Sequence, residues 1–226
     1  DSYMNVDSAT GTALLAAGNT LSYGEGMDVT LGASTDNTLN IAGTFDWSKQ
    51  FPDRAPATAT IHADRLFLIG GKVDLKDAVI APDGTDAAGK PSSQLLVLAG
   101  NAAQIRGNYD RIPYSGTEDN SAALDGTNIT GAYHSINLGG GQLTLTKSSI
   151  GSDNNAAYDK EYSDPCIELH ALGSYVDANG HTTFGLGAKN LVTLDGSTIT
   201  TTGQGGQEID IMSGAIMLKN GSALTS

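Results

Sequence analysis

The chain has 226 residues, of which 39% are hydrophobic and only 16% are charged, and it contains 29 glycines. This composition is typical of strands and turns and offers little that would support long helices. The formal net charge is −13, and no basic cluster interrupts it, which excludes a nucleic-acid groove and disfavours contact with anionic lipid. No apolar run approaches the roughly 18 residues of a membrane-spanning helix, so we expect no membrane insertion.

Within residues 1–57 a sequence pattern typical of strands occurs only at Val29–Leu31 and Leu39–Ile41. We therefore expect an irregular N-terminal part of a repeat array there, or its cap. The single cysteine, Cys166, excludes an internal disulfide, and its surroundings lack the spacing of a zinc site. The chain opens at Asp1 without a signal segment, so we expect it to be continuous with further repeats of a longer chain.

From residue 58 to residue 226 the sequence repeats itself. Five aliphatic positions recur with the same spacing in two distant units, and both units carry a glycine pair at the same place. The first unit has Leu66, Leu68, Val73, Leu75 and Ile80, and the second has Ile136, Leu138, Leu143, Leu145 and Ile150. Partial copies are Ile209, Ile211, Ile216 and Leu218 with Ala223; Val192, Leu194 and Ile199; and Leu96, Leu98 and Ile105 with Ala103.

Within each unit the aliphatic residues alternate as they do in strands, and the gaps are rich in turn residues. A unit this small cannot bury its apolar side alone, so it must stack on another, strand pairing parallel to strand. The sequence therefore predicts an all-β fold, a right-handed parallel β-helix (β-solenoid) with polar loop insertions. Asp74, Lys76, Thr144, Thr146 and Lys219 are expected to face outward. An antiparallel sandwich is the alternative, but it does not explain the shared spacing.

Polar insertions separate the repeats near residues 81–93, 107–127, 151–165 and 176–187. A rigid solenoid holds the loops that leave its corners, so these insertions are the expected functional parts. Tyrosines gather in and beside them, together with charged residues that hydrogen-bond sugars. The predicted ligand-binding residues, for a glycan or a protein, are Tyr109, Asp110, Arg111, Tyr114, Tyr158, Asp159 and Tyr162.

The units Ala59–Ile80, Ile136–Ile150 and Ile209–Thr225 resemble the β-helix repeats of filamentous-haemagglutinin-like exoproteins and autotransporter passenger domains. The pattern of a strand, an Ala or Gly turn, L-x-L and then S-x-I carries the resemblance, which covers about half of residues 58–226. It implies a segment of a bacterial adhesin, secreted or on the cell surface in association with the outer membrane. Such a segment would provide a rigid stalk and a loop-based surface for a host-cell, matrix or glycan ligand.

A carbohydrate-active β-helix enzyme, either a polysaccharide lyase or a glycoside hydrolase, is the alternative function. The Asp-Asp and Gly-His-Gly signatures of galacturonase-like hydrolases are absent. The acidic residues Asp153, Asp159, Glu161 and Asp164 fit a solvated loop better than a calcium site. The histidines (62, 134, 170 and 181) lack ligand spacing, and we expect Tyr133 and His134 to form a surface pair. We accordingly expect no catalytic residues, no metal and no cofactor.

Overall fold

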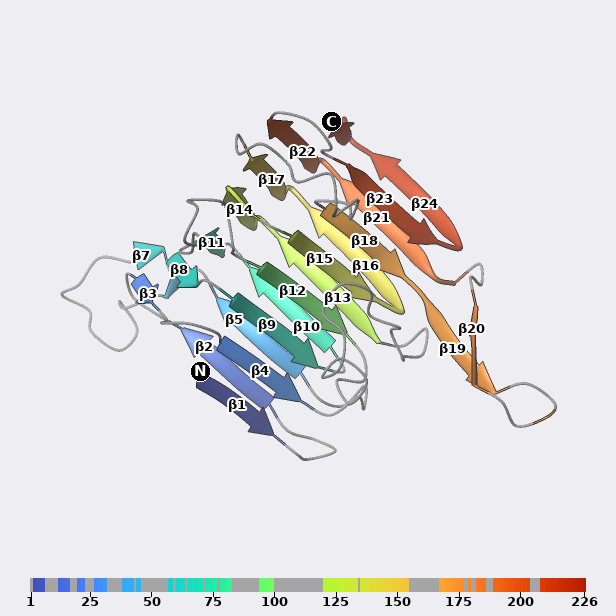
Figure 1. Cartoon of the computed structure of the whole chain (residues 1–226), viewed down its shortest axis with the longest axis horizontal. Coiled ribbons are helices and arrows are strands. Elements are labelled where there is room, and N and C mark those ends of the chain that lie inside the picture. Colours follow the sequence, from blue (N-terminus) through green and yellow to red (C-terminus); the bar gives the residue numbers. More distant parts are fainter. Residues whose placement is uncertain are drawn as a thin grey trace.

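The structure is a computed structural model of the whole chain (Figure 1). It describes residues 2–6, 12–16, 20–22, 27–31, 38–42, 44–45, 57–58, 60–63, 65–70, 72–76, 78–82, 94–99, 120–133, 135–154, 167–176, 179, 182–185, 189–203 and 208–226. Every regular element in these ranges is a strand. None of the described residues forms a helix long and apolar enough to cross a bilayer.

Three parallel sheets of seven strands each contain most of the described residues. Sheet A consists of β1 (Ser2–Val6), β4 (Met27–Leu31), β9 (Arg65–Gly70), β12 (Gln94–Ala99), β15 (Ser135–Gly140), β18 (Ile167–Ala171) and β23 (Ile209–Ser213). Sheet B consists of β2 (Thr12–Ala16), β5 (Thr38–Ala42), β10 (Lys72–Lys76), β13 (Ser121–Asp125), β16 (Gln142–Thr146), β21 (Leu191–Asp195) and β24 (Ala215–Lys219). Sheet C consists of β3 (Thr20–Ser22), β8 (Thr60–Ala63), β11 (Val79–Pro82), β14 (Asn128–Gly131), β17 (Ser149–Asn154), β22 (Thr198–Gly203) and β25 (Ala223–Thr225).

The chain visits sheets A, B and C in the same order each time. We call each set of three successive sheet strands, one from each sheet, a rung; rung 1 is β1, β2 and β3, and rung 7 is β23, β24 and β25. Rungs follow one another from the N-terminal to the C-terminal end in Figure 1. Among the described strands only two pairs are antiparallel, β6 (Thr44–Phe45) with β7 (Ala57–Thr58) and β19 (Gly173–Val176) with β20 (Thr182–Gly185). The parallel sheets rule out the antiparallel sandwich.

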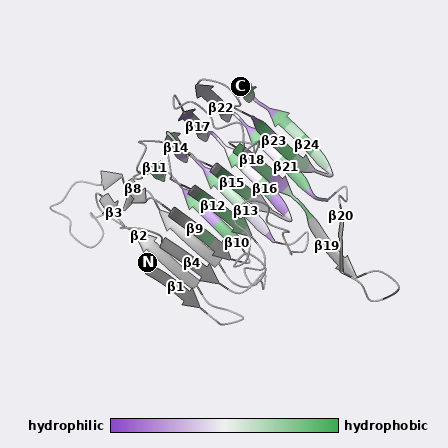
Figure 2. Cartoon of the chain, in the orientation of Figure 1, coloured by the Kyte–Doolittle hydropathy of each residue, from purple (hydrophilic) through white to green (hydrophobic). Residues whose placement is uncertain are grey.

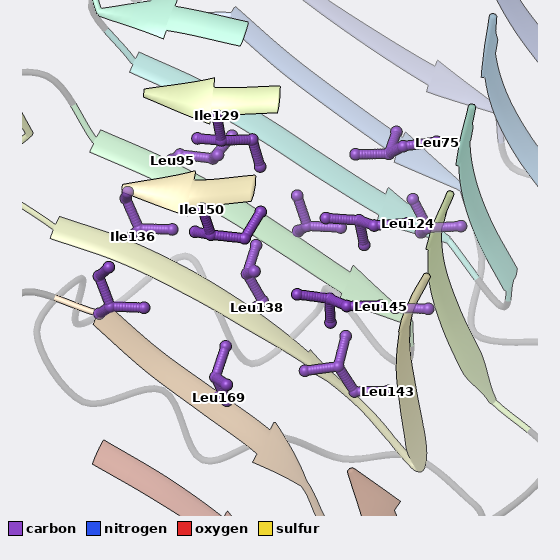
Figure 3. Close-up of a cluster of buried hydrophobic side chains, with 14 of the residues drawn as sticks. Leu75, Leu95, Leu124, Ile129, Ile136, Leu138, Leu143, Leu145, Ile150 and Leu169 are labelled. Carbon is purple, nitrogen blue, oxygen red and sulfur yellow. The ribbon is translucent and has the colours of Figure 1, made fainter. Parts of the chain in front are cut away.

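The registers between strands confirm the repeat. Leu75 pairs with Leu124, Leu124 with Leu145, Leu145 with Leu194, and Leu194 with Leu218, so one sequence position forms a column that crosses the rungs. Figure 3 shows Leu75, Leu124 and Leu145 stacked in this way. Hydrophobic residues recur on successive strands from β12 to β24 (Figure 2). The other core columns end at Ile209, Ile211, Ile216 and Leu224.

Two details of the predicted repeat are wrong by one residue. Leu95 and Val97, not Leu96 and Leu98, share the core columns, because Leu95 pairs with Ile136 and Val97 with Leu138. A one-residue shift moves every side chain of a strand to the opposite face. In rung 7 the fifth position is Leu224 rather than Ala223, because the preceding corner contains three residues where the corresponding corners of rungs 3 to 6 contain two.

The strands can be compared with the predicted ranges. Residues 1–57 contribute β1 to β5 to the three sheets, so the part expected to be irregular contains strands in register with the rest. The insertion expected at 107–127 contains β13, and those at 81–93 and 151–165 begin with the ends of β11 and β17. The insertion expected at 176–187 contains most of the hairpin β19–β20, which projects from the sheets in Figure 1.

A ladder of hydroxyl groups lines the short corner between sheets B and C. The backbone N–H of Thr127 donates to Ser148 Oγ at 3.1 Å, and that of Ser148 donates to Ser197 Oγ at 3.0 Å. Ser148 Oγ donates to the carbonyl of Leu124 at 3.0 Å. Because buried backbone groups need partners, this ladder explains the S-x-I pattern of the repeat.

The same corner needs a left-handed backbone. Gly126 and Gly196 adopt φ of 61° and 60°, and Lys147 occupies the equivalent place with φ of 46°. A left-handed conformation costs a residue with a Cβ about 1–2 kcal/mol, and the greater entropy of unfolded glycine offsets part of that cost. We expect Lys147→Gly to raise the free energy of unfolding by about 0.5–1 kcal/mol, measured by urea denaturation. Lys147→Ala keeps the strain and should give no such gain; a less stable glycine variant would contradict the explanation.

Candidate functional site

The long connections from rung 3 onward all lie at the two ends of sheet A. Residues 83–93 and 155–166 lead from sheet C into sheet A, and residues 100–120 and 172–190 lead from sheet A into sheet B. By contrast, the corners between sheets B and C contain only two or three residues in these rungs. One long connection lies elsewhere, between β5 and β8 in rung 2. The outer face of sheet A is therefore the surface that most of the insertions border.

Part of this outer face is buried even though its side chains point away from the core. Leu96 and Leu98 alternate with the core residues Leu95 and Val97, yet they are only 4% and 3% exposed. Sheet A is thus covered on both faces at β12, as parallel sheets usually are. The residues that point away from the core also form columns across the strands. In these outer columns Leu96 pairs with Asn137 of β15, and Leu98 pairs with Gly139. These columns change from apolar to polar as they cross the sheet.

Three titratable residues follow on the next strands, and we call Glu168, His170 and Asp210 the sheet A cluster. Glu168 in β18 pairs in register with Asp210 in β23, which places their Cα atoms about 4.8 Å apart. His170 lies two residues along β18, on the same face as Glu168. Its Nε2 atom lies 3.3 Å from Glu168 Oε2, and the two side chains are 18% and 16% exposed. The cluster is therefore a partly desolvated set of hydrogen-bonding groups.

The environment of His170 favours the neutral imidazole. Burial lowers its pKa below the ordinary value, and the negative charge of Asp210 partly opposes that shift. A neutral ring whose Nε2 faces Glu168 donates its proton there and leaves Nδ1 as an acceptor. The cluster can then accept hydrogen bonds from ligand hydroxyl groups through two carboxylates and one imidazole nitrogen.

The lowered pKa of His170 predicts an acid-dependent loss of stability. The unfolded chain binds a proton at His170 near pH 6.5, whereas the folded chain binds it only at lower pH. Stability from this group is therefore complete above that pH and falls as the pH drops from there to the folded pKa. We expect the melting temperature of the wild type to fall more steeply than that of His170→Asn between pH 7 and pH 5. Parallel curves for the two proteins would contradict this assignment.

Gly139 separates the apolar and polar parts of this surface. A Cβ atom at this position would lie 3.4 Å from both Leu98 Cδ1 and His170 Cβ. Glycine therefore lets the side chains of the two flanking strands approach each other over β15. A side chain at Gly139 would fill the space between Leu98 and His170.

The predicted ligand-binding residues all lie outside the described residues. In the sequence, Tyr109, Asp110, Arg111 and Tyr114 belong to the connection from β12 to β13, and Tyr158, Asp159 and Tyr162 belong to that from β17 to β18. The first connection starts at Ala99, the last residue of β12, and the second ends at Ile167, the first residue of β18. Those two anchors lie at opposite ends of the sheet A strands. The topology therefore brings both connections to sheet A but attaches them at opposite ends of its strands.

Other candidate residues behave differently from expectation. Tyr133 is buried, not on the surface; its hydroxyl donates to the Ile80 carbonyl at 3.2 Å, and burial raises the pKa of the phenol. Its neighbour His134 lies outside the described residues. Asp153 accepts a hydrogen bond from Thr202 Oγ1 at 3.1 Å. In the part of the chain that the structure describes, no group of three or more His, Cys, Asp or Glu side chains could hold a metal ion.

No protein-family model, curated protein or solved structure matches the chain. The sheet A cluster is hard to find from the sequence because Asp210 lies far along the chain from Glu168 and His170. Aligning the text Ile167–Ala171 (IELHA) with Ile209–Ser213 (IDIMS) as one repeat position would have placed Glu168 beside Asp210. Charged residues at the outward positions of two neighbouring strands are the signal that could have found it.

Proposed function

We propose that the chain folds as a right-handed parallel β-helix, a β-solenoid from whose corners polar loops emerge. The repeated passage through sheets A, B and C supports this proposal, because a chain that pairs each strand with the one three sheet strands later must wind around a shared core. Parallel crossover connections are right-handed in nearly all proteins, which supports the handedness.

We further propose that it is a segment of a secreted or surface-exposed bacterial adhesin. The stacked rungs would serve as a rigid stalk, and the outer face of sheet A with its bordering insertions would bind a host-cell, matrix or glycan ligand. The clustering of the long connections at both ends of sheet A is the observation that carries this proposal. Functional loops are commonly held by a rigid scaffold, and here one sheet receives most of them.

The sheet A cluster gives this proposal a direct test. We expect the double variant Glu168→Gln and Asp210→Asn to bind at least about tenfold more weakly than the wild type, because two charge-assisted hydrogen bonds are lost. Binding is measured on an array of host and bacterial glycans and on intact epithelial cells. Asp74→Asn is the matched control, since Asp74 is exposed on the outer face of sheet B.

A second set of variants locates the contribution of the insertions. Alanine at Tyr109, Tyr114 and Tyr158 should abolish adhesion while circular dichroism stays unchanged, because aromatic faces cover sugar rings. Loss of binding in the tyrosine variant but not in the carboxylate variant would indicate a binding site on the insertions and not on the outer face of sheet A. Unchanged binding in both variants would contradict the proposal that the outer face of sheet A and its bordering insertions bind the ligand.

A carbohydrate-active enzyme is the second candidate function, and one observation favours it. Glu168 and Asp210 are carboxylates on adjacent parallel strands, and retaining glycosidases hold their two carboxyl groups about 5–5.5 Å apart. The test is incubation with polygalacturonate and alginate, followed by the release of reducing ends and the absorbance of unsaturated products. Turnover that is lost in Glu168→Gln would support the enzyme, and no turnover would leave adhesion as the function.

A further inference from the structure

Two stretches of the chain match the Asn-x-Ser/Thr pattern that glycosyltransferases recognise when they attach a sugar to asparagine. They are Asn128-Ile129-Thr130 and Asn220-Gly221-Ser222. A pattern this short often arises by chance, so it does not by itself identify a modified residue. The transferase must also reach the side-chain amide of the asparagine and the hydroxyl group two residues later. The fold therefore decides which of the two stretches is usable.

The first stretch presents both of these groups to solvent. It forms the first three residues of β14, the central strand of sheet C (Figure 1). Because side chains alternate along a strand, Ile129 belongs to the core (Figure 3), whereas Asn128 and Thr130 are exposed on the outer face. In the part of the chain that the structure describes, no hydrogen bond holds the amide of Asn128 or the hydroxyl of Thr130. Both groups are therefore available to an enzyme.

The neighbouring strands leave room for a bulky group on Asn128. This residue pairs in register with Val79 of β11 on one side and with Ser149 of β17 on the other. Thr130 pairs with Gly151 of β17, which has no side chain. The side chains in register with the two residues are thus short, and a sugar on the Asn128 amide would not have to displace a long neighbour.

The second stretch offers neither group in the folded chain. The Asn220 amide donates a hydrogen bond to Asp195 Oδ1, and the backbone of Asn220 is left-handed with φ of 50°. The Ser222 hydroxyl belongs to the ladder at the corner between sheets B and C. It donates to the Lys219 carbonyl at 2.7 Å and accepts from the Ser197 N–H at 3.1 Å. A transferase would have to break these hydrogen bonds before it could bind this stretch.

We propose that Asn128 is a site of N-linked glycosylation. The donor is a sugar whose anomeric carbon carries a diphosphate leaving group, linked to a nucleoside or to a lipid. In the transfer, the amide nitrogen of Asn128 forms a C–N bond to the anomeric carbon, while the C–O bond to the diphosphate breaks and its electron pair leaves with the diphosphate. A basic group of the transferase takes up the proton that the amide nitrogen loses. The product carries a bulky, hydrated group on the outer face of sheet C.

Peptide mass spectrometry tests this site in the protein isolated from the cells that produce it. We expect the peptide that contains Asn128 to carry the additional mass of a hexose or an N-acetylhexosamine. The peptide that contains Asn220 should carry none. An unmodified Asn128 in this protein would overturn the proposal.

Transfer to the purified, unmodified protein tests whether the fold selects Asn128. The folded chain is incubated with uridine-diphosphate glucose and a soluble transferase that recognises Asn-x-Ser/Thr. Rates are divided by those of two synthetic peptides that span the same stretches, so that the sequence preference of the enzyme cancels. We expect Asn128 to react at least about tenfold faster than Asn220 on this scale, because the hydrogen bonds of Asn220 and Ser222 must break first. Equal relative rates would contradict the selection by the fold.

Changes at Thr130 provide matched variants, because this position is exposed on the outer face of β14. Thr130→Ser keeps the hydroxyl group and should retain the sugar, whereas Thr130→Ala should lower the occupancy of Asn128 at least about tenfold. Asn128→Gln keeps an amide but should carry no sugar, and circular dichroism shows whether each variant retains its strands. Wild-type occupancy in Thr130→Ala would overturn the proposal. None of these results depends on ligand binding at sheet A.

Discussion

Replacing Gly140 with alanine is expected to destabilise the fold by about 3 kcal/mol, at the upper end of what overpacking usually costs. Gly140 is the last residue of β15, where sheet A turns into sheet B. A Cβ atom there would lie 2.5 Å from the Gln142 carbonyl oxygen, 3.2 Å from the Ala122 nitrogen and 3.3 Å from the Asn120 oxygen. All three atoms belong to the backbone, so no flexible side chain can move aside.

Urea denaturation followed by circular dichroism measures this effect, and Gly151→Ala is the matched control. Gly151 lies in β17, where a Cβ atom would meet only Thr130 Cγ2 at 3.6 Å and the Thr200 oxygen at 3.7 Å. Those are ordinary contacts, and alanine costs less conformational entropy than glycine within a strand, so this variant should be neutral or slightly more stable. Equal stability of the two variants would show that the corner tolerates a side chain.

The repeat was readable where the corners are short. In rungs 3 and 5 a single residue, Gly71 or Gly141, connects sheet A to sheet B, so all five aliphatic positions keep one spacing. In rungs 4 and 6 the connections 100–120 and 172–190 separate the strand of sheet A from that of sheet B. Sequence spacing therefore revealed two complete units, while the registers reveal that the same columns run through every rung.

The error at β12 has a physical cause. The text Gln94–Ala99 (QLLVLA) is apolar at both odd and even positions, so alternation gives no preferred face. Both faces are in fact buried there, with Leu95 in the core and Leu96 on the covered outer face of sheet A. A strand buried on two sides loses the pattern from which its register could be read.

The candidate site was less predictable than the fold. Glu168 and Asp210 lie far apart in the sequence and become neighbours only because β18 and β23 pair in parallel. Tyrosine-rich insertions were visible in the sequence, but which sheet they border depends on the order in which the chain visits the sheets. The composition indicated where loops occur in the sequence. The strand order shows that most of the long ones begin or end at a strand of sheet A.

Leu145→Ala is expected to lower the free energy of unfolding by about 2–5 kcal/mol, the usual cost of truncating a buried leucine. Leu145 is fully buried and stacks between Leu124 and Leu194 in its column, so the lost methyl groups leave a cavity that rigid rungs on both sides cannot fill. The midpoint and slope of urea denaturation measure the loss.

Leu218→Ala makes the same chemical change at the last position of the same column, where the side chain is 51% exposed. The side chain already contacts solvent, so water rather than a cavity replaces the lost atoms, and the cost should stay below about 1 kcal/mol. Both variants are compared at the same protein concentration. Because chemistry and column are held constant, a cost at Leu218 as large as at Leu145 would mean that stacking between rungs is not what buries this column.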